Sequence, residues 1–451
     1  MRAAFIRLHR YIGLLIAAFL FLSGLTGAII SWDRELDALL NPQLMRSHSS
    51  GRPQDPFELA KRAEARDPRI RVWYVPLRPE PGHSMQLRVE PAVDAAASRL
   101  HDPRYNQLFI DPITGEELGR RQWGDPWPIT RESFVPFLFE LHRSLHIPVV
   151  GGVKGLGFAI LGGVAILWML NSLMGFYLTL PSRRRADRKT ASPGTDAPGG
   201  GASVQAGKRN FLQRWRPAWI VRWSGGAPKL TLDLHRAFSL WTWLVLFLIA
   251  FTAFSISLYG EVFYPVMSRF SQATPSPLSA RVPSGRLHPV KPILGFRQVV
   301  DVAARAGVER GWKAPPGGVF YFSAYGIYSV SFFEPGQDHG GPGLGPPVLF
   351  LDGNDGKVLG TQQPWKGTAA DVYQQAQIPL HSGRILGLPG RVLISAMGLV
   401  VAMLSVTGVL IWLRKRAAAS KSVDSVRVHR PSSGTRNVAS PSDAAPGGTL
   451  R

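Results

Sequence analysis

Four histidines stand next to apolar segments, where they could hold a metal-containing cofactor. His9 and His235 lie at the starts of two such segments, and His142 and His381 lie shortly before two others. A b-type haem needs an apolar slot and one or two neutral imidazoles facing its iron. If His9 pairs with His235 and His142 with His381, the chain would hold two haems b, one near each surface of a membrane, and electrons could cross between them.

Two alternatives stay open for these residues. A lone histidine at a helix end is usually an interfacial residue beside lipid headgroups. In addition, His146 lies one helical turn beyond His142 and is an alternative ligand there. The chain has no cysteine, which excludes disulfides, thiolate sites and iron–sulfur clusters and leaves histidine as the main candidate metal ligand.

Four apolar segments could position the histidines in a membrane. Each covers the roughly 20 residues that a hydrocarbon core of about 30 Å requires. The first follows a basic start but has no small-residue cleavage site after it, so we interpret it as an uncleaved helix. The segments are Tyr11–Trp32, Val153–Leu180, Leu240–Tyr259 and Val392–Leu413.

The basic residues predict the orientation. The chain has 52 Lys and Arg against 30 Asp and Glu, and the basic residues gather beside the apolar segments. Because cytoplasmic loops are rich in Lys and Arg, we expect both termini and the middle segment to be cytoplasmic. The chain would thus be a multi-pass protein of the bacterial inner (cytoplasmic) membrane. Membrane lipid, and not nucleic acid, is then the expected partner of this basic chain.

The two halves of the sequence match in order and spacing. One offset relates His9 to His235, Thr26 to Thr252 and Glu35 to Glu261, and farther on residues 108–111 resemble residues 349–352. This agreement predicts two tandem repeats that run in the same direction, related by an axis along the membrane normal.

Each segment predicted to be exported has the pattern of a small α+β domain. A helix is expected at 57–65 and again at 296–306, each followed by alternating strands. The strands are expected at 71–75, 85–89 and 108–111, and at 319–322, 328–333 and 348–352.

We therefore predict a membrane α-helical fold: a four-helix transmembrane bundle from two tandem repeats, with two small periplasmic α+β domains. The expected segments are transmembrane helices at 1–32 and 233–260, periplasmic domains at 33–132 and 261–372, interfacial segments with transmembrane helices at 133–181 and 373–414, a cytoplasmic linker at 182–232 and a disordered cytoplasmic tail at 415–451.

The sequence resembles the PepSY-associated transmembrane family. The resemblance rests on Leu8–Gly13, Ser23–Gly27, Asp111–Gly115, Leu141–Leu145, Gly175–Pro181, Asp233–Ala237, His381–Arg384, Gly387–Arg391 and Ser405–Gly408, which cover nearly the whole chain except the linker and tail. It implies PepSY-like domains in the periplasm. Some members look like inner-membrane siderophore reductases, in which two b-haems held by helix-end histidines carry electrons to ferric siderophore.

From the residues and the resemblance together, we expect a di-haem b protein for iron acquisition that reduces ferric siderophore or another periplasmic acceptor. If it is an enzyme, it is a ferric-siderophore reductase, an oxidoreductase. The chain has no flavin or nicotinamide fold, so the unknown electron donor is another protein, a quinol or a soluble reductant. The alternative is a non-enzymatic sensor or binding protein whose PepSY-like domains bind a peptide or protein partner.

Overall fold

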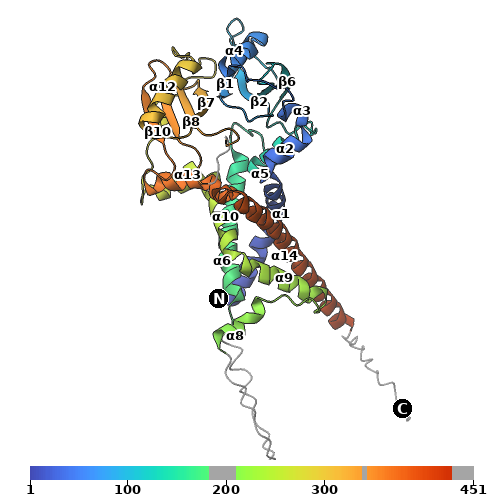
Figure 1. Cartoon of the computed structure of the whole chain (residues 1–451). Coiled ribbons are helices and arrows are strands. Elements are labelled where there is room, and N and C mark those ends of the chain that lie inside the picture. Colours follow the sequence, from blue (N-terminus) through green and yellow to red (C-terminus); the bar gives the residue numbers. More distant parts are fainter. Residues whose placement is uncertain (182–209, 338–342, 429–451) are drawn as a thin grey trace, which may run out of the picture.

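The computed structural model describes residues 1–181, 210–337 and 343–428. Long helices form one part of the molecule, and a β-sheet with its own helices lies at one end of them (Figure 1). The N-terminus lies toward the other end of the long helices (Figure 1). Most of the predicted linker and of the predicted tail lies outside the described residues.

Three helices in the described part of the chain are long and apolar enough, by length and composition, to cross a membrane. They are α1 (Arg2–Ile30), α6 (Leu156–Thr179) and α14 (Leu388–Val428), of which residues 388–420 form the candidate span. The pair α9 (Ala227–Trp241) and α10 (Trp243–Ser257) would be a fourth span if it is counted as one. The chain is thus a membrane-associated helical protein.

The third apolar segment is bent. The axes of α9 and α10 differ by 71°. At the break, the hydroxyl of Thr242 donates a 2.7 Å hydrogen bond to the carbonyl of Phe238, four residues earlier. Such bonds often accompany bending of a helix. Residues 233–260, for which the sequence predicts one helix, therefore form two helices with different directions.

The last helix extends beyond its expected end. α14 continues to Val428 and so includes part of the segment 415–451 for which composition predicts disorder. Three consecutive alanines, 417–419, follow the basic residues at this point. Alanine is the strongest helix former, and the helix can therefore continue past the apolar stretch.

α1 and α14 cross closely because each has a glycine at the contact. A Cβ atom on Gly24 would lie 2.6 Å from the carbonyl oxygen of Gly398, and one on Gly398 would collide with the carbonyl oxygen of Gly24. Small residues allow membrane helices this close approach. An apolar cluster of Leu246, Met397 and Val401, packed against Leu20 and Trp168 among others, joins α1, α6, α10 and α14.

The strands of both α+β segments form one antiparallel sheet. Its order is β10 (Val358–Gln362), β9 (Val348–Asp352), β8 (Ile327–Phe332), β7 (Pro316–Phe322), β1 (Ile70–Pro76), β2 (Met85–Pro91), β5 (Gln107–Ile110) and β6 (Glu117–Arg121). β1 and β7 connect the two halves, with Tyr74 opposite Phe320. A separate hairpin contains β3 (Val93–Asp94) and β4 (Arg99–Leu100).

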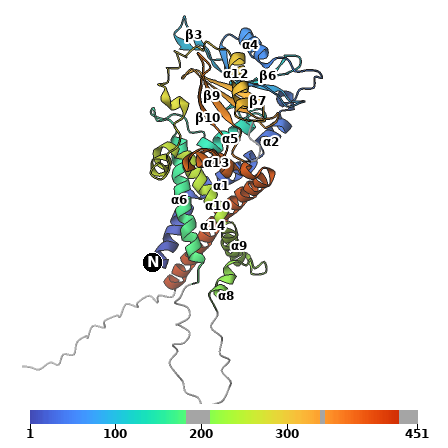
Figure 2. The same ribbon diagram turned by 60° about the vertical axis from the view of Figure 1, so that its left-hand side comes forward.

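Two helices pack on the same side of this sheet (Figure 2). They are α4 (Pro56–Arg66) and α12 (Phe296–Glu309). Leu59 of α4 and Val299 of α12 share one buried core with strands of both halves. The two helices and six strands predicted for these segments are confirmed. The strands could be predicted because alternating apolar residues determine which face of a strand is buried. We call the eight strands with α4 and α12 the sheet region.

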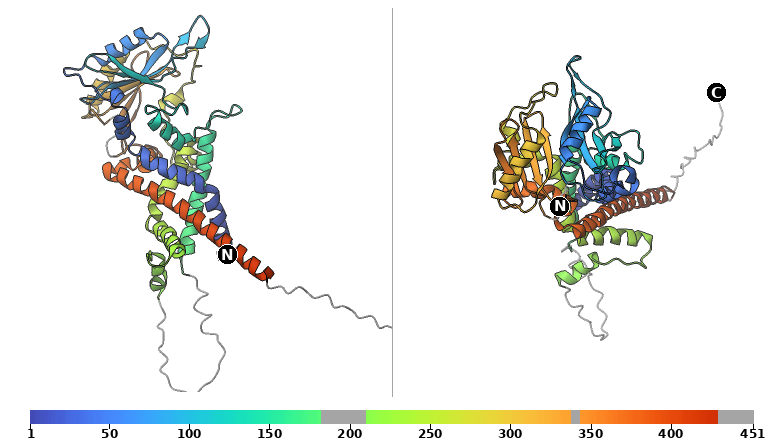
Figure 3. Two further views of the ribbon diagram at one scale, coloured as in Figure 1. Left: turned by 90° about the vertical axis from the view of Figure 1, so that its right-hand side faces the viewer. Right: turned by 45° about the horizontal axis from the view of Figure 1, so that its top comes forward.

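Short helices lie between the sheet region and the long helices (Figure 3). They include α2 (Asp33–Leu40), α5 (Phe134–Ser144) and α13 (Ala369–Ser382). Arg121 of β6 donates two hydrogen bonds of 2.9 Å to Asp37 of α2, and the two side chains are only 4% and 5% exposed. Loss of either partner would leave a buried charge unpaired, so this ion pair joins the sheet firmly to α2, which follows α1 in the chain.

The other short elements complete the description. They are α3 (Pro42–Met45), α8 (Phe211–Trp215), η1 (Arg216–Ala218), η2 (Tyr259–Phe263), α11 (Tyr264–Met267), η3 (Pro277–Ala280) and η4 (Arg384–Leu386). Both α8 and η1 lie within the predicted cytoplasmic linker.

Candidate functional site

The structure places the four predicted histidines as two facing pairs. The ring centroids of His142 on α5 and His381 on α13 are 6.2 Å apart, and we call these residues the sheet-proximal pair. The ring centroids of His9 on α1 and His235 on α9 are 6.4 Å apart, and they form the sheet-distal pair. Both pairings agree with those expected from the sequence.

One nitrogen of each imidazole has a hydrogen-bond partner on a neighbouring helix. Nδ1 of His142, His381 and His235 lies 3.0 Å from the hydroxyl of Thr26, Thr252 and Thr407, respectively, and Nδ1 of His9 lies 3.1 Å from the carbonyl oxygen of Asn171. A carbonyl oxygen can only accept a hydrogen bond. His9 therefore carries its proton on Nδ1.

The same tautomer follows for the other three histidines. Each threonine hydroxyl has a single proton. This proton already has an acceptor, since the hydroxyls of Thr26, Thr252 and Thr407 lie 2.8 to 2.9 Å from the carbonyl four residues earlier in the helix. With that proton given to the helix, the hydroxyl accepts from the histidine, and this arrangement favours the tautomer with its proton on Nδ1. Nε2 of each neutral imidazole is then left with a free lone pair, the form that binds metal.

The Nε2 atoms of the four histidines have no hydrogen-bond partner in the part of the chain that the structure describes. At the sheet-proximal pair, outside the membrane-spanning segments, burial lowers the pKa of His142 to about 4. Burial also lowers the pKa of His381. Both imidazoles therefore stay neutral at physiological pH, as metal ligation requires.

Glycines let three of the rings approach the neighbouring helix. A Cβ atom on Gly27 or on Gly175 would lie 3.0 Å from Cε1 of His142 or of His9. One on Gly408 would lie 3.3 Å from Cε1 of His235. The glycines on α1 and α14 directly follow the threonines that hold the rings. The helix thus fixes each ring by a hydrogen bond and leaves room for it at the next position.

This geometry fits an iron held between two imidazoles. A metal–imidazole bond is about 2 Å long and a ring centroid lies about 1 Å behind its nitrogen, so two rings across one metal have centroids about 6 Å apart. Each pair supplies only two ligands, and no group of three or more His, Asp or Glu that could hold a metal ion occurs in the described parts of the chain. A zinc ion takes four ligands. A haem would bring the other ligands of its iron with it, so the two imidazoles of one pair would suffice to hold it.

His146 does not face either pair. Its ring stacks on Phe137 with centroids 4.6 Å apart, and its Nε2 lies 2.8 Å from the carbonyl oxygen of that residue. Since the carbonyl can only accept, Nε2 of His146 is the donor and has no lone pair free for a metal. The residue that faces His381 is His142.

The partners of the imidazoles were not predicted from the sequence. Thr26 and Thr252 occupy equivalent positions in the two halves, but this equivalence did not indicate that each forms a hydrogen bond with a histidine. A small residue directly after the threonine is the signal that could have found them, as in Thr26-Gly27, Thr252-Ala253 and Thr407-Gly408. The carbonyl of Asn171 has no such signal, because any residue could supply it.

Comparison with known proteins supports the resemblance found in the sequence. No curated protein matches this chain at a significant level. The model of the family described as PepSY-associated TM region matches residues 6–415. The match includes all four facing histidines and the whole sheet region. The chain therefore belongs to the PepSY-associated TM region family.

Proposed function

We propose that this chain is a di-haem b protein of the bacterial inner membrane that passes electrons across the membrane and reduces ferric siderophore in the periplasm. The observation that carries the proposal is the two facing histidine pairs, whose Nε2 lone pairs are free. His9 and Thr26 lie on the same helix, about 25 Å apart along its axis. Because Thr26 contacts His142 of the sheet-proximal pair, the two pairs lie near opposite ends of this helix.

The proposal includes a four-helix bundle made of two tandem repeats, with both termini in the cytoplasm. The hydrogen bonds support the repeat. Within the first half Thr26 holds His142, and within the second half Thr252 holds His381. Each half supplies one histidine to each pair, as two parallel repeats around a shared axis would.

The protein residues have a limited role in this chemistry. A haem held at each pair would supply one-electron transfer. The threonines and the Asn171 carbonyl hold Nδ1 of the imidazoles and leave the Nε2 lone pairs free for a metal. Such outer hydrogen bonds orient the ligand and raise its basicity. One electron from a protein, quinol or soluble donor converts the Fe³⁺ of the chelate to Fe²⁺, and the chelator holds the product less strongly.

The purified protein tests this proposal in two steps. The protein should carry low-spin b-haem with a Soret band that shifts on reduction with dithionite. After removal of excess dithionite, a ferric hydroxamate should reoxidise it, and a ferrous-specific chelator should trap one Fe²⁺ for each electron lost. Bound haem that no ferric chelate reoxidises would reject the reductase function and leave an electron carrier with another acceptor. A protein without haem would favour the non-enzymatic sensor or binding protein.

A further inference from the structure

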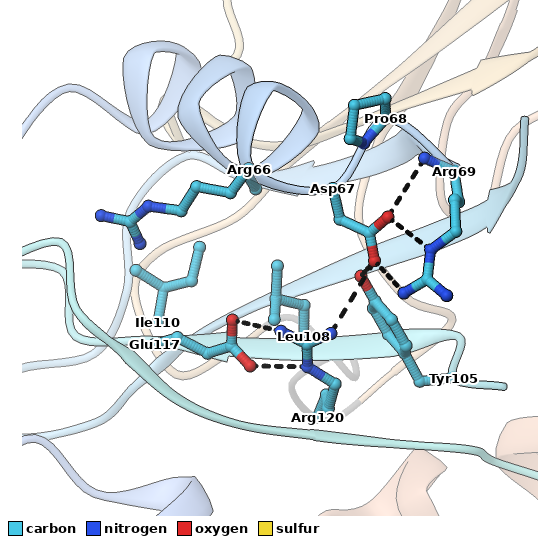
Figure 4. Close-up of a pocket in the computed structure, with 10 residues that line it drawn as sticks. Arg66, Asp67, Pro68, Arg69, Tyr105, Leu108, Ile110, Glu117 and Arg120 are labelled. Carbon is cyan, nitrogen blue, oxygen red and sulfur yellow. Dashed lines mark hydrogen bonds and ion pairs between the residues drawn. The ribbon is translucent and has the colours of Figure 1, made fainter. Parts of the chain in front are cut away.

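The sheet region has a cavity of about 400 Å³ that is separate from the histidine pairs (Figure 4). It lies between the C-terminal end of α4 and the strands β5 and β6. Three arginines, Arg66, Arg69 and Arg120, are among the residues that line it, with Arg66 pointing away from Arg69 (Figure 4), and the buried side chains of Leu108 and Ile110 form its inner wall. Arg121, the next residue on β6, points to the opposite face and binds α2. The cavity therefore opens on the side of the sheet that carries α4.

Two carboxylates in the cavity hold two of the arginines, Arg69 and Arg120, in position. Asp67 accepts hydrogen bonds of 2.8 Å from both Nε and Nη2 of Arg69, and one of 2.9 Å from the hydroxyl of Tyr105. Glu117 accepts bonds of 2.6 and 2.8 Å from Nε and Nη2 of Arg120. All four carboxylate oxygens are thus occupied. They orient the arginines and are not available to a cation.

Each arginine keeps N–H donors that no group in the described residues uses. Nη1 of Arg69 makes no hydrogen bond within the described chain, and Nη1 of Arg120 has only an ion-pair contact of 3.8 Å to Asp67. Arg66 uses Nη1 alone, in a bond of 3.3 Å to the carbonyl of Gly115. The lining residues carry three guanidinium charges and two carboxylate charges, so the cavity has a net charge of one positive.

This charge balance holds over a wide pH range. The hydrogen bonds from Arg69 hold the pKa of Asp67 well below its usual range. Burial raises the pKa of Tyr105 to about 12. Asp67 is therefore ionised and Tyr105 protonated at any pH at which the protein would work.

We propose that this cavity binds a small organic polycarboxylate. The planar fork of a guanidinium matches a carboxylate and can bind it through two parallel hydrogen bonds. Several such groups around one cavity favour a ligand with more than one carboxylate. The cavity of about 400 Å³ is larger than an inorganic anion and leaves room for the hydrocarbon part of such a ligand. The cavity size is within the range of small-molecule sites.

Titration calorimetry of the full chain in detergent tests the proposal with tricarballylate, a tricarboxylate with no hydroxyl group. Arg66→Gln and Arg120→Gln should each weaken binding about tenfold, the effect of losing a hydrogen bond to a charged group. Arg305→Gln is the matched control, because it removes the same charge from the exposed side of α12. It should bind like the wild type.

Arg66→Gln keeps the test valid if Arg120→Gln does not fold, since Arg66 binds neither carboxylate of the cavity. Circular dichroism checks the fold of each variant. Inorganic phosphate should bind at least tenfold more weakly than tricarballylate. No binding of tricarballylate at millimolar concentration would overturn the proposal. Equal affinity in the Arg66→Gln and Arg305→Gln variants, or equal affinity for phosphate, would also overturn it, because general attraction of anions would then explain the result.

Discussion

At the residue scale, the hydrogen bonds to Nδ1 decide what the histidines can do. The same imidazole with its proton on Nε2 would present a donor to its partner ring and could not bind iron there. Thr26 and Thr252 prevent this because their only proton is already given to their own helix. The threonines would therefore act through the histidines, without touching a bound metal themselves.

Thr26→Val should weaken cofactor binding at the sheet-proximal pair. Valine has nearly the same shape but cannot accept the proton of His142. Loss of such an outer hydrogen bond typically lowers metal affinity about 10- to 100-fold. The measurement is haem content per chain after purification, together with the reduction midpoint of the remaining haem. Thr26→Ser keeps the hydroxyl and should behave like the wild type. If the Val and Ser variants are alike, the hydroxyl has no part in fixing the ring.

At the element scale, the local sequence pattern predicted individual helices and strands, but it did not predict the contacts between elements far apart in the chain. The helix at 57–65 and six of the eight strands of the sheet were predicted, because apolar alternation depends only on nearby residues. The two outer strands β6 and β10, with fewer buried residues, were not predicted. The joining of β1 to β7 was not, since Tyr74 and Phe320 meet through the fold and neither strand encodes its partner. The bend at Thr242 was also missed, because one hydroxyl in an apolar run changes hydropathy very little.

The glycines determine how closely an imidazole can approach the neighbouring helix. The substitution Gly27→Ala tests this. Its new methyl group would lie 3.0 Å from Cε1 of His142 and would push the ring away from Thr26. Haem should be lost from the sheet-proximal pair, and the sheet-distal pair should keep its own. Gly163→Ala on α6 is the control, because nothing lies within 4 Å of its Cβ position. Equal haem content in both variants would show that the glycine at 27 serves helix packing alone.

At the scale of the whole molecule, we expect the sheet region to lie on the periplasmic side of the membrane, and both termini and the segment between α6 and α9 to lie on the cytoplasmic side. Reporters active only in the periplasm should be active when fused after Gly82 or Gly336 and silent after Gly200. The reason is the gathering of Lys and Arg beside the ends of the apolar segments opposite the sheet region. The assay is reporter activity in intact cells, normalised to the amount of fusion protein. Activity after Gly200 would contradict four crossings with cytoplasmic termini.

The pairing of the histidines across the two halves is the central claim, and haem stoichiometry in double variants tests it most directly. The wild type should hold two haems per chain. A double variant within one pair, His9→Ala with His235→Ala, should keep one haem, because the sheet-proximal pair remains intact. A double variant across the pairs, His9→Ala with His142→Ala, should hold none. His146→Ala is the control and should keep both, since that ring binds Phe137. One haem left in the across-pair variant, or none in the within-pair variant, would contradict two independent sites each held by one histidine from each half.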